Sequence, residues 1–334
     1  MIDTNILISI PLDDRRRKFF PAETIEELKK IGNVYLNDSE KHFTEDEFAE
    51  RIKDIDVCIT HWGSTKFTNK VLKNANKLKL VAHAAGSVGW LVTDEVYDTG
   101  IKVSSSNRIM ARSVAEGVLG YILTGLKRIP QYDRAMRNGQ LWPQYDDAES
   151  LFNKKIGLIG LGTVGRFLLG LLVPFNVQVK VYDPYITKES LSNYKNVELC
   201  PTVEEILEWG DIISLHASKT PETYHMINGD RLKLIRNGAL LVNTSRGANI
   251  DEKALIEELK EDRFTAILDV YEEEPLDLES ELRQLDNVTV MPHVAGVSGL
   301  ELTYGMIDEI KRFSSHEPLK LEIPREAFRL MTIE

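Results

Sequence analysis

The chain has 334 residues, of which 43% are hydrophobic and 28% are charged, a composition unlike that of disordered or collagen-like proteins. At roughly 150 residues per domain, this length predicts two domains, each large enough for its own core. Asp and Glu outnumber Lys and Arg by 52 to 41, which gives a formal net charge of −11. This acidic balance argues against a nucleic-acid partner, and we interpret the basic run at residues 15–18 as a solvated face.

Membrane insertion is not expected from the sequence. No uninterrupted apolar run approaches the roughly 20 residues that cross a bilayer, and Asp3 does not suit the start of a signal peptide. Cys58 and Cys200 have no metal-type spacing and are interpreted as reduced thiols. We therefore expect a cytoplasmic protein with no membrane partner and no metal.

Short apolar runs alternate with amphipathic segments, a pattern typical of α/β folds with parallel strands. In the first hundred residues, strands are predicted at residues 5–10, 33–36, 56–60 and 78–83. A helix is predicted at residues 22–31, and Thr44 resembles a helix N-cap. A long helix is predicted at residues 113–127. The polar segment 130–143 is expected to be irregular, and it could serve as an arm in subunit contacts.

The alternation is stronger after Lys154. Six further strands are predicted, at residues 155–159, 177–182, 211–215, 239–243, 265–268 and 288–290. Such a series predicts a doubly wound parallel sheet.

A glycine-rich loop, Gly160-Leu161-Gly162-Thr163-Val164-Gly165, follows the strand that ends at Ile159. The expected roles are a tight turn at Gly160, access for a pyrophosphate at Gly162, and close helix packing at Gly165. Asp183 ends the next strand at the spacing expected for a residue that binds both ribose hydroxyls. Because a carboxylate repels a 2′-phosphate, the motif predicts NAD(H) rather than NADP(H). The alternative is a glycine turn without a nucleotide.

Polar residues follow three later strands, and the carboxyl ends of parallel strands are where ligands bind. Arg246 follows one strand, the acidic run 272–274 the next, and His293 the last. An Arg binds a carboxylate bidentately, and a His with a carboxylate partner exchanges protons near neutral pH. Beside a nicotinamide, this set predicts reduction of a 2-oxo acid. Taken singly, these residues could instead be a loop-locking ion pair, a solvated acidic turn and a structural histidine.

With these motifs, the chain resembles the D-isomer-specific 2-hydroxyacid dehydrogenase family over nearly its whole length. The strongest stretches are residues 157–183, 214–216, 220–223, 243–251, 268–276 and 292–296. The resemblance implies three catalytic residues: Arg246, the acid/base His293, and its partner Glu274, which directly precedes Pro275 and lies five residues after Asp269.

The resemblance also implies binding residues. The implied cofactor contacts are Gly160, Gly162, Thr163, Val164, Gly165, Asp183, His216, Thr223, Thr244, Ser245, Asp269 and Gly296. Substrate is expected to contact Gly86, Ser87 and Val88 as well as Arg246 and His293. This loop departs from the family pattern, Gly-x-Gly followed by Asp-Asn, because its second glycine is Gly89 and the polar pair is absent.

The family's layout implies two Rossmann-like domains, with the nucleotide domain inserted into the other. A flavodoxin-like, substrate-binding domain is expected at residues 1–107 and 297–334, including a returning helix at 299–314, and an NAD-binding domain at 108–296. A homodimer is also implied, and Trp142 is either a residue that reaches the partner's active site or an anchor of the surface arm.

Two alternatives of the same fold remain. One is an NADH-sensing binding protein similar to the C-terminal-binding-protein corepressors, which keep a similar triad. The other is a formate dehydrogenase-like enzyme, although that branch has Gln where Glu274 lies. An epimerase is not supported, because no Tyr-x-x-x-Lys pair follows the nucleotide loop at a suitable place.

Overall fold

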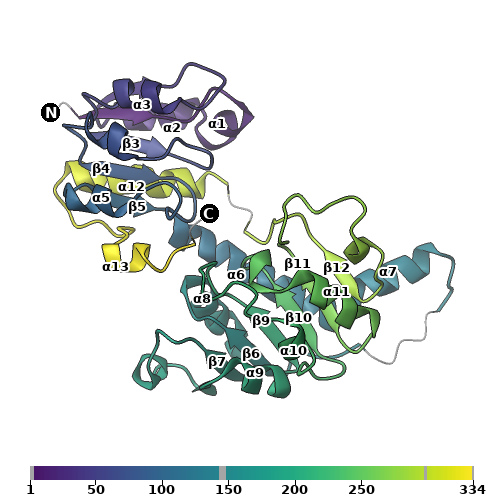
Figure 1. The fold of residues 1–334 in the computed structure, drawn as a ribbon. Coiled ribbons are helices and arrows are strands. Elements are labelled where there is room, and N and C mark those ends of the chain that lie inside the picture. Colours follow the sequence, from purple (N-terminus) through teal and green to yellow (C-terminus); the bar gives the residue numbers. More distant parts are fainter. Residues whose placement is uncertain (1–3, 143–147, 297–298, 333–334) are drawn as a thin grey trace. The chain divides into compact units, whose positions relative to one another are not determined.

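A computed structural model describes residues 4–142, 148–296 and 299–332. The chain divides into two compact units (Figure 1). Unit 1 comprises Met1–Met110 and Val297–Glu334, and unit 2 comprises Ala111–Gly296. The sequence placed this border after residue 107 and the structure places it after residue 110.

Unit 1 is built on a five-stranded parallel sheet with the order β2-β1-β3-β4-β5, the order of flavodoxin-like folds. The strands are β1 (Asn5–Ile8), β2 (Asn33–Leu36), β3 (Val57–Thr60), β4 (Leu80–His83) and β5 (Lys102–Ser105). The helices are α1 (Asp14–Phe19), α2 (Ala22–Lys29), α3 (Glu45–Arg51), α4 (Asn69–Leu72), α5 (Asp94–Asp98), α12 (Glu301–Ser314) and α13 (Arg325–Phe328).

Both faces of this sheet are covered, which explains why β3 and β4 are buried along their whole length and apolar except at their last residues, Thr60 and His83. Helices α3 to α5 bury Phe48, Val71 and Val96 on one face, whereas α2 and α12 bury Leu28 and Met306 in the cluster of the other. Figure 1 shows α12, in yellow, beside β4 and β5, although they are distant in sequence.

Two expectations for unit 1 were incomplete. The strand β5 was missed because its sequence, Lys102 to Ser105, is polar; the buried Ser104 is satisfied by Glu309 of α12, at 3.1 Å. The basic run at residues 15–18 is not simply a solvated face. It belongs to α1, where Arg16 is buried and donates to the carbonyl oxygens of Ile10 and Asn37.

Unit 2 contains a seven-stranded parallel sheet with the order β12-β11-β10-β9-β6-β7-β8, which is doubly wound around β6. The strands are β6 (Lys155–Ile159), β7 (Gln178–Tyr182), β8 (Val197–Leu199), β9 (Ile212–Leu215), β10 (Leu240–Asn243), β11 (Thr265–Leu268) and β12 (Val288–Val290). All six predicted strands are present, and β8 is an additional edge strand. The predicted α/β class with two parallel sheets is therefore confirmed.

The helices of unit 2 pack on both faces of its sheet. They are α7 (Ile129–Arg137), α8 (Thr163–Leu172), α9 (Val203–Trp209), α10 (Gly229–Leu232) and α11 (Glu252–Lys260), together with α6 (Asn107–Leu126), which includes the border between the units. Four 3-10 turns complete the described elements: Val173–Phe175, Lys188–Leu191, Gly247–Asn249 and Glu281–Arg283.

The expectation that residues 130–143 are irregular was wrong for their first part, which forms α7. A proline in the first helical turn removes no helical hydrogen bond, so Pro130 is compatible with the start of α7. Beyond α7, Leu141 and Trp142 are 93% and 86% exposed. Residues 143–147 lie outside the described part of the chain.

Helix α6 is, by length and composition alone, sufficient to cross a membrane, with a mean hydropathy of 1.2 over 18 residues. The sequence reading, which expected no such segment, missed it because Arg108, Arg112 and Glu116 interrupt the run. Its buried side chains, among them Val118 and Ile122, pack in the core of unit 2. Because 28% of that window is buried, α6 contributes one face to the core of unit 2.

Candidate active site

The glycine loop after β6 has the geometry expected of a phosphate-binding turn. Gly160 has a φ of 93°, and a Cβ there would lie 2.8 Å from the backbone nitrogen of Ala217. A Cβ at Gly165 would lie 3.2 Å from the carbonyl oxygen of Gly160, so α8 packs tightly on the loop. At Gly162, by contrast, no heavy atom of the described chain lies within 4 Å of the Cβ position. The loop is thus open where a phosphate would approach.

The start of α8 faces this opening, since Gly162 is its N-cap residue. The N–H groups of Thr163, Val164 and Gly165 belong to the first turn, where no helical acceptor exists and the helix dipole favours an anion. Asp183 is held beside the loop, because its carboxylate accepts hydrogen bonds from the N–H of Leu161 at 2.8 Å and of Tyr185 at 2.9 Å. A carboxylate has about four acceptor positions, so capacity for ribose hydroxyls remains.

The other predicted cofactor residues of the β9 and β10 loops differ in their surroundings. His216 Nε2 lies 2.9 Å from Ser214 Oγ, and burial lowers the pKa of His216 to about 4, so the ring is neutral. Thr223 and Ser245 are engaged within their own turns, with Ser218 O and Asn243 Oδ1 respectively. Thr244 Oγ1 is buried without a hydrogen-bond partner in the described chain. An unpartnered hydroxyl of this kind fits a site that a polar ligand completes.

Asp269, expected to contact the cofactor, has a structural role in this conformation. It is 1% exposed and accepts hydrogen bonds from Tyr121 Oη at 3.0 Å and from the N–H of Val294 and Ala295 at 2.8 and 2.9 Å. The carboxylate therefore fixes the segment between His293 and Gly296. Sequence reasoning missed Tyr121, since nothing in a long apolar helix marks it as a partner of Asp269.

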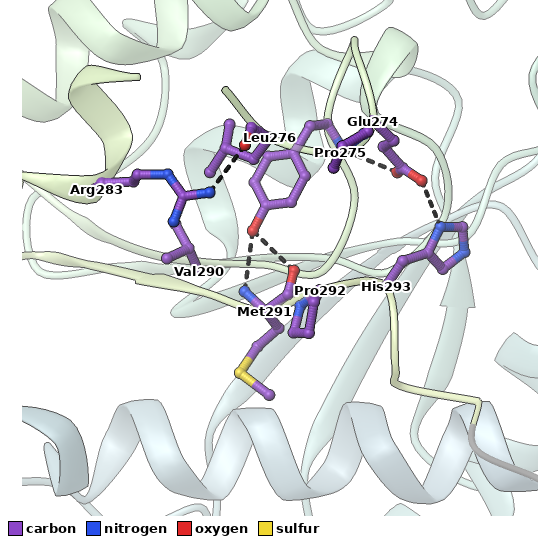
Figure 2. A pocket seen from close by; sticks show the side chains of 9 residues that line it. Glu274, Pro275, Leu276, Arg283, Val290, Met291, Pro292 and His293 are labelled. Carbon is purple, nitrogen blue, oxygen red and sulfur yellow. Dashed lines mark hydrogen bonds and ion pairs between the residues drawn. The ribbon is translucent and has the colours of Figure 1, made fainter. Parts of the chain in front are cut away.

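Glu274 and His293 are in direct contact, as the sequence predicted (Figure 2). His293 Nδ1 lies 2.7 Å from Glu274 Oε2, and Glu274 Oε1 accepts from the N–H of Tyr271 at 3.2 Å. The His293 side chain remains 47% exposed, so its outer edge is accessible to a substrate. His293 also has a φ of 54°, an uncommon backbone conformation that is found preferentially at functional sites.

The contact changes the acidity of both groups. The hydrogen bond and negative charge of Glu274 raise the pKa of His293 against the opposing effects of burial and of Arg246. Burial alone would raise the pKa of Glu274, but the hydrogen bond from His293, its charge, the Tyr271 N–H and the Arg246 charge together lower it. The pair therefore favours an imidazolium beside a carboxylate.

Arg246 is held at the end of the β10 loop, where its Nη1 donates to the carbonyl oxygen of Ser245 at 2.7 Å. The next residue, Gly247, lies against the backbone that precedes Glu274: a Cβ at Gly247 would be 1.8 Å from the carbonyl carbon of Tyr271. The sequence reading did not single out Gly247, although a glycine directly after a candidate Arg was an available signal. This close approach joins the Arg246 and Glu274 loops.

A cavity of about 560 Å³ adjoins the Glu274–His293 pair (Figure 2). It is lined by Tyr271, Glu274, Pro275, Leu276, Arg283, Val290, Met291, Pro292 and His293. Tyr271 braces its wall, because its hydroxyl donates to Met291 O at 2.8 Å and accepts from Met291 N at 2.9 Å. In the described part of the chain, no group of three or more metal-ligating side chains occurs.

The predicted substrate loop lies in unit 1, directly after β4. Gly86 and Val88 are buried, and Ser105 Oγ donates to the carbonyl oxygen of Ala85 at 3.0 Å. The N–H groups of Gly86, Ser87 and Val88 donate no hydrogen bond to any described residue. Consecutive unpartnered N–H groups are suited to bind an anion.

Comparison with known proteins identifies the family. Residues 119–295 match the model for the NAD-binding domain of the D-isomer specific 2-hydroxyacid dehydrogenases. The chain is 31% identical over 286 residues to the glyoxylate reductase of Pyrococcus horikoshii, covering 83% of this chain and 84% of that protein. The chain belongs to the D-isomer specific 2-hydroxyacid dehydrogenase family. It is also 35% identical over 289 residues to the D-3-phosphoglycerate dehydrogenase of Methanocaldococcus jannaschii, but it spans only 52% of that protein.

Solved structures share the fold of this chain. A protein from Pyrococcus horikoshii is similar with a TM-score of 0.79 and 26% identity, covering 98% of this chain and 97% of that one. An acyclic imino acid reductase in complex with NADPH and D-Arg is similar with a TM-score of 0.78 and 25% identity, covering 96% and 100% of the two chains. The dehydrogenase therefore uses a nicotinamide cofactor and interconverts 2-hydroxy and 2-oxo acids, as the sequence predicted.

Proposed function

We propose that this dehydrogenase reduces a small 2-oxo acid to the D-2-hydroxy acid with NADH, using Arg246, Glu274 and His293. The observation that carries the proposal is the 2.7 Å contact between His293 and Glu274, which favours a protonated imidazole with an accessible edge. Relatives named glyoxylate reductase and hydroxypyruvate reductase support a small substrate. Glyoxylate and hydroxypyruvate are therefore the first acids to test.

The open glycine loop, the start of α8 and the Thr244 hydroxyl fit a dinucleotide. In this proposal, the N–H groups of the first turn of α8 bind the pyrophosphate, and Asp183 binds the ribose hydroxyls. Gly162 and Gly165 permit this approach, and the nearby His216, Thr223, Ser245, Asp269 and Gly296 form or support the rest of the cofactor site. When bound, the nicotinamide supplies the hydride.

The polar residues act on the substrate. Arg246 binds its carboxylate and polarises the carbonyl, and the N–H groups of Gly86, Ser87 and Val88 add donors for the carboxylate. Glu274 accepts from Nδ1 of His293, which leaves Nε2 to carry the proton. As the carbonyl carbon accepts hydride, His293 Nε2 gives this proton to the carbonyl oxygen. For oxidation of the 2-hydroxy acid, neutral His293 takes the hydroxyl proton.

The direct test follows NADH absorbance at 340 nm while the protein is incubated with a panel of 2-oxo acids. We expect oxidation of NADH with at least one acid, and a loss of about two to four orders of magnitude in rate for His293→Ala. His316→Asn, a change at an exposed histidine with a similar left-handed backbone, is the matched control. This reaction would be rejected if no acid were turned over, or if the rate of His293→Ala were as high as that of the His316→Asn control. NADH binding without turnover would favour the NADH-sensing alternative. NAD⁺-dependent oxidation of formate would favour the formate dehydrogenase-like alternative.

We further propose a homodimer that forms through the α7 arm. The arm exposes Ile129, Met136, Leu141 and Trp142, and exposed apolar clusters are typical of protein interfaces. In the dimer, Trp142 of the partner subunit is expected to reach the active site. Sedimentation should give about twice the 37.9 kDa chain mass; a single-chain mass would reject the dimer.

We propose a cytoplasmic location without nucleic-acid or membrane partners, supported by the acidic charge and two buried free thiols.

A further inference from the structure

The loop proposed to bind the substrate carboxylate is fastened to a segment more than 240 residues away. Ser87 Oγ donates to the carbonyl oxygen of Thr332 at 3.3 Å and accepts from the N–H of Gly89 at 3.2 Å. A Cβ at Gly89 would lie 2.2 Å from the same Thr332 oxygen. Glycine is therefore needed at position 89 because another backbone crosses directly over it.

Residues 323–332, here named the strap, are fixed to the rest of unit 1 by a backbone hydrogen bond and by ion pairs. Ile323 N–H donates to Val103 O of β5 at 2.8 Å. Arg325 pairs with Asp94 at 2.6 Å and with Asp98 at 2.7 Å, at the two ends of α5. The strap is therefore a fixed part of unit 1, and Thr332 is held at its far end.

The strap also completes the apolar packing beneath the loop. Its side chains Phe328 and Met331 pack against the cluster that contains Val88 and Leu91. The Phe328 ring lies 5.3 Å from that of Tyr97 in α5. The buried side of the substrate loop thus rests partly on the strap, while the N–H groups of residues 86–88 donate to no described residue.

We propose that the strap positions residues 86–89 for substrate binding, so that Gly89, Thr332 and the strap anchors set the affinity for the 2-oxo acid. This inference rests on the proposed function of the loop. Preorganised donors bind an anion more tightly than donors that must be ordered on binding. It also gives a physical reason for the departure from the family's Gly-x-Gly pattern, since the second glycine here accommodates the strap.

A double-mutant cycle tests the proposal in the full-length protein. The variants are Gly89→Ala, a truncation that removes residues 329–334, and the two combined. Gly120→Ala is the matched control, because a Cβ there would meet no heavy atom of the described residues within 4 Å. We expect each single change to raise the KM for the 2-oxo acid about three- to tenfold, the effect of losing one or two hydrogen bonds. The kcat, the KM for NADH and the Kd for NADH should stay within about twofold of wild type.

The combined variant is decisive. If Gly89→Ala acts by clashing with Thr332, the truncation removes the clash, and the combined KM should equal that of the truncation alone. Additive effects, or a fall in kcat together with NADH affinity, would overturn the proposal. The double variant Arg325→Gln, Arg329→Gln provides a second test, because it removes the side-chain pairing to Asp94. Its KM for the 2-oxo acid should also rise.

A readout that does not depend on catalysis separates this inference from the proposed function. Hydrogen exchange of residues 84–92 should accelerate in the truncation and remain unchanged in Gly120→Ala. If wild type turns over no 2-oxo acid but exchange accelerates, the proposed function fails and the strap contact stands. If wild type is active but neither KM nor exchange changes, the strap inference fails alone.

Discussion

His293 Nδ1 faces Glu274 Oε2 at 2.7 Å, so the carboxylate directs the opposite edge of the imidazole toward solvent. Because Glu274 raises the pKa of His293, the imidazolium persists to a higher pH than in an ordinary histidine. Reduction of a 2-oxo acid needs this imidazolium. The reduction rate should therefore be maintained at low pH and fall as pH rises through the raised pKa, whereas oxidation should show the reverse.

Glu274→Gln removes the charge that raises this pKa. We expect the falling limb of kcat/KM for reduction to move to lower pH, and the rate above neutral pH to drop about 10- to 100-fold, as for loss of a charged hydrogen bond. The measurement is the pH dependence of kcat/KM for both variant and wild type. Glu273→Gln, the change at the preceding residue, is the control and should leave the limb in place. An unshifted limb in Glu274→Gln would show that Glu274 does not set the acidity of His293.

The approach of Gly247 to Tyr271 predicts a steric effect on stability. Gly247→Ala places a Cβ 1.8 Å from a backbone carbon, so the β10 or β11 loop must move. Overpacking of this kind costs about 1–3 kcal/mol, and Arg246 moves with the loop, so kcat/KM should fall as well. Denaturant unfolding and kinetics measure the two effects. Gly170→Ala in α8, where a Cβ would meet no described heavy atom within 4 Å, should show neither effect. A Gly247→Ala protein as stable as wild type would contradict the structure.

Asp183 predicts the choice of cofactor. At equal concentrations, NADH should raise the Tm more than NADPH, because the carboxylate accepts ribose hydroxyls and repels a 2′-phosphate. Asp183→Ser should narrow the difference between the two cofactors, even if loss of the bond to Leu161 weakens both. Asp308→Ser, at a 73% exposed carboxylate of α12, is the control. A larger shift with NADPH in the wild-type protein would reject NADH as the preferred cofactor.

Two buried histidines predict acid lability of unit 1. His61 and His83 are fully buried, and three of their four ring nitrogens have no hydrogen-bond partner in the described chain. Burial, together with the charge of His83, lowers the pKa of His61 to about 2, and burial lowers that of His83 to about 3. In the unfolded chain both titrate near 6.5. The buried neutral rings therefore do not destabilise unit 1 above that pH, and the free energy of unfolding falls progressively below it, because the unfolded chain binds protons that the folded chain does not.

The expected loss is about 2 kcal/mol per histidine at pH 5 relative to neutral pH. Hydrogen exchange of residues 57–62 and 80–84 should accelerate between pH 6.5 and 5, after correction for intrinsic rates. His61→Phe, which keeps an aromatic ring beside Phe19 but cannot be protonated, should flatten this dependence. An equally steep dependence in His61→Phe and in wild type would reject His61 as a source of it.

Local patterns were sufficient to predict much of unit 2. The apolar runs identify six strands and the glycine spacing places the nucleotide loop. The choice of Glu274 among residues 272–274 as the partner of His293 came from the family resemblance, through its position before Pro275. What could not be predicted depends on contacts between distant segments. Strand β5 is polar and is stabilised by a glutamate of α12, and α7 forms because Pro130 falls in a first turn.

The site shows the same division. The types and order of Arg246, Glu274 and His293 could be predicted from the sequence, because their chemistry is carried by the side chains. The contacts that hold them could not be predicted, because they join segments that are far apart in sequence. Examples are the approach of Gly247 to Tyr271 and the hydrogen bond between Asp269 and Tyr121. The loop at Gly86 illustrates this limit. The position of its second glycine, Gly89, is explained by the carbonyl oxygen of Thr332, which lies 2.2 Å from where a Cβ would be and cannot be located from the sequence.

The discontinuous course of the chain has a consequence for biosynthesis. Ser104 of β5 is satisfied by Glu309 of α12, 205 residues later, and the whole of unit 2 is translated in between. During synthesis, the N-terminal part of unit 1 emerges with one face of its sheet only partly covered, by α2, while unit 2 can fold as soon as residue 296 has left the ribosome. The nucleotide-binding unit is thus complete first, and the partly covered apolar face of the unit 1 sheet is exposed to aggregation and to chaperones until α12 is synthesised.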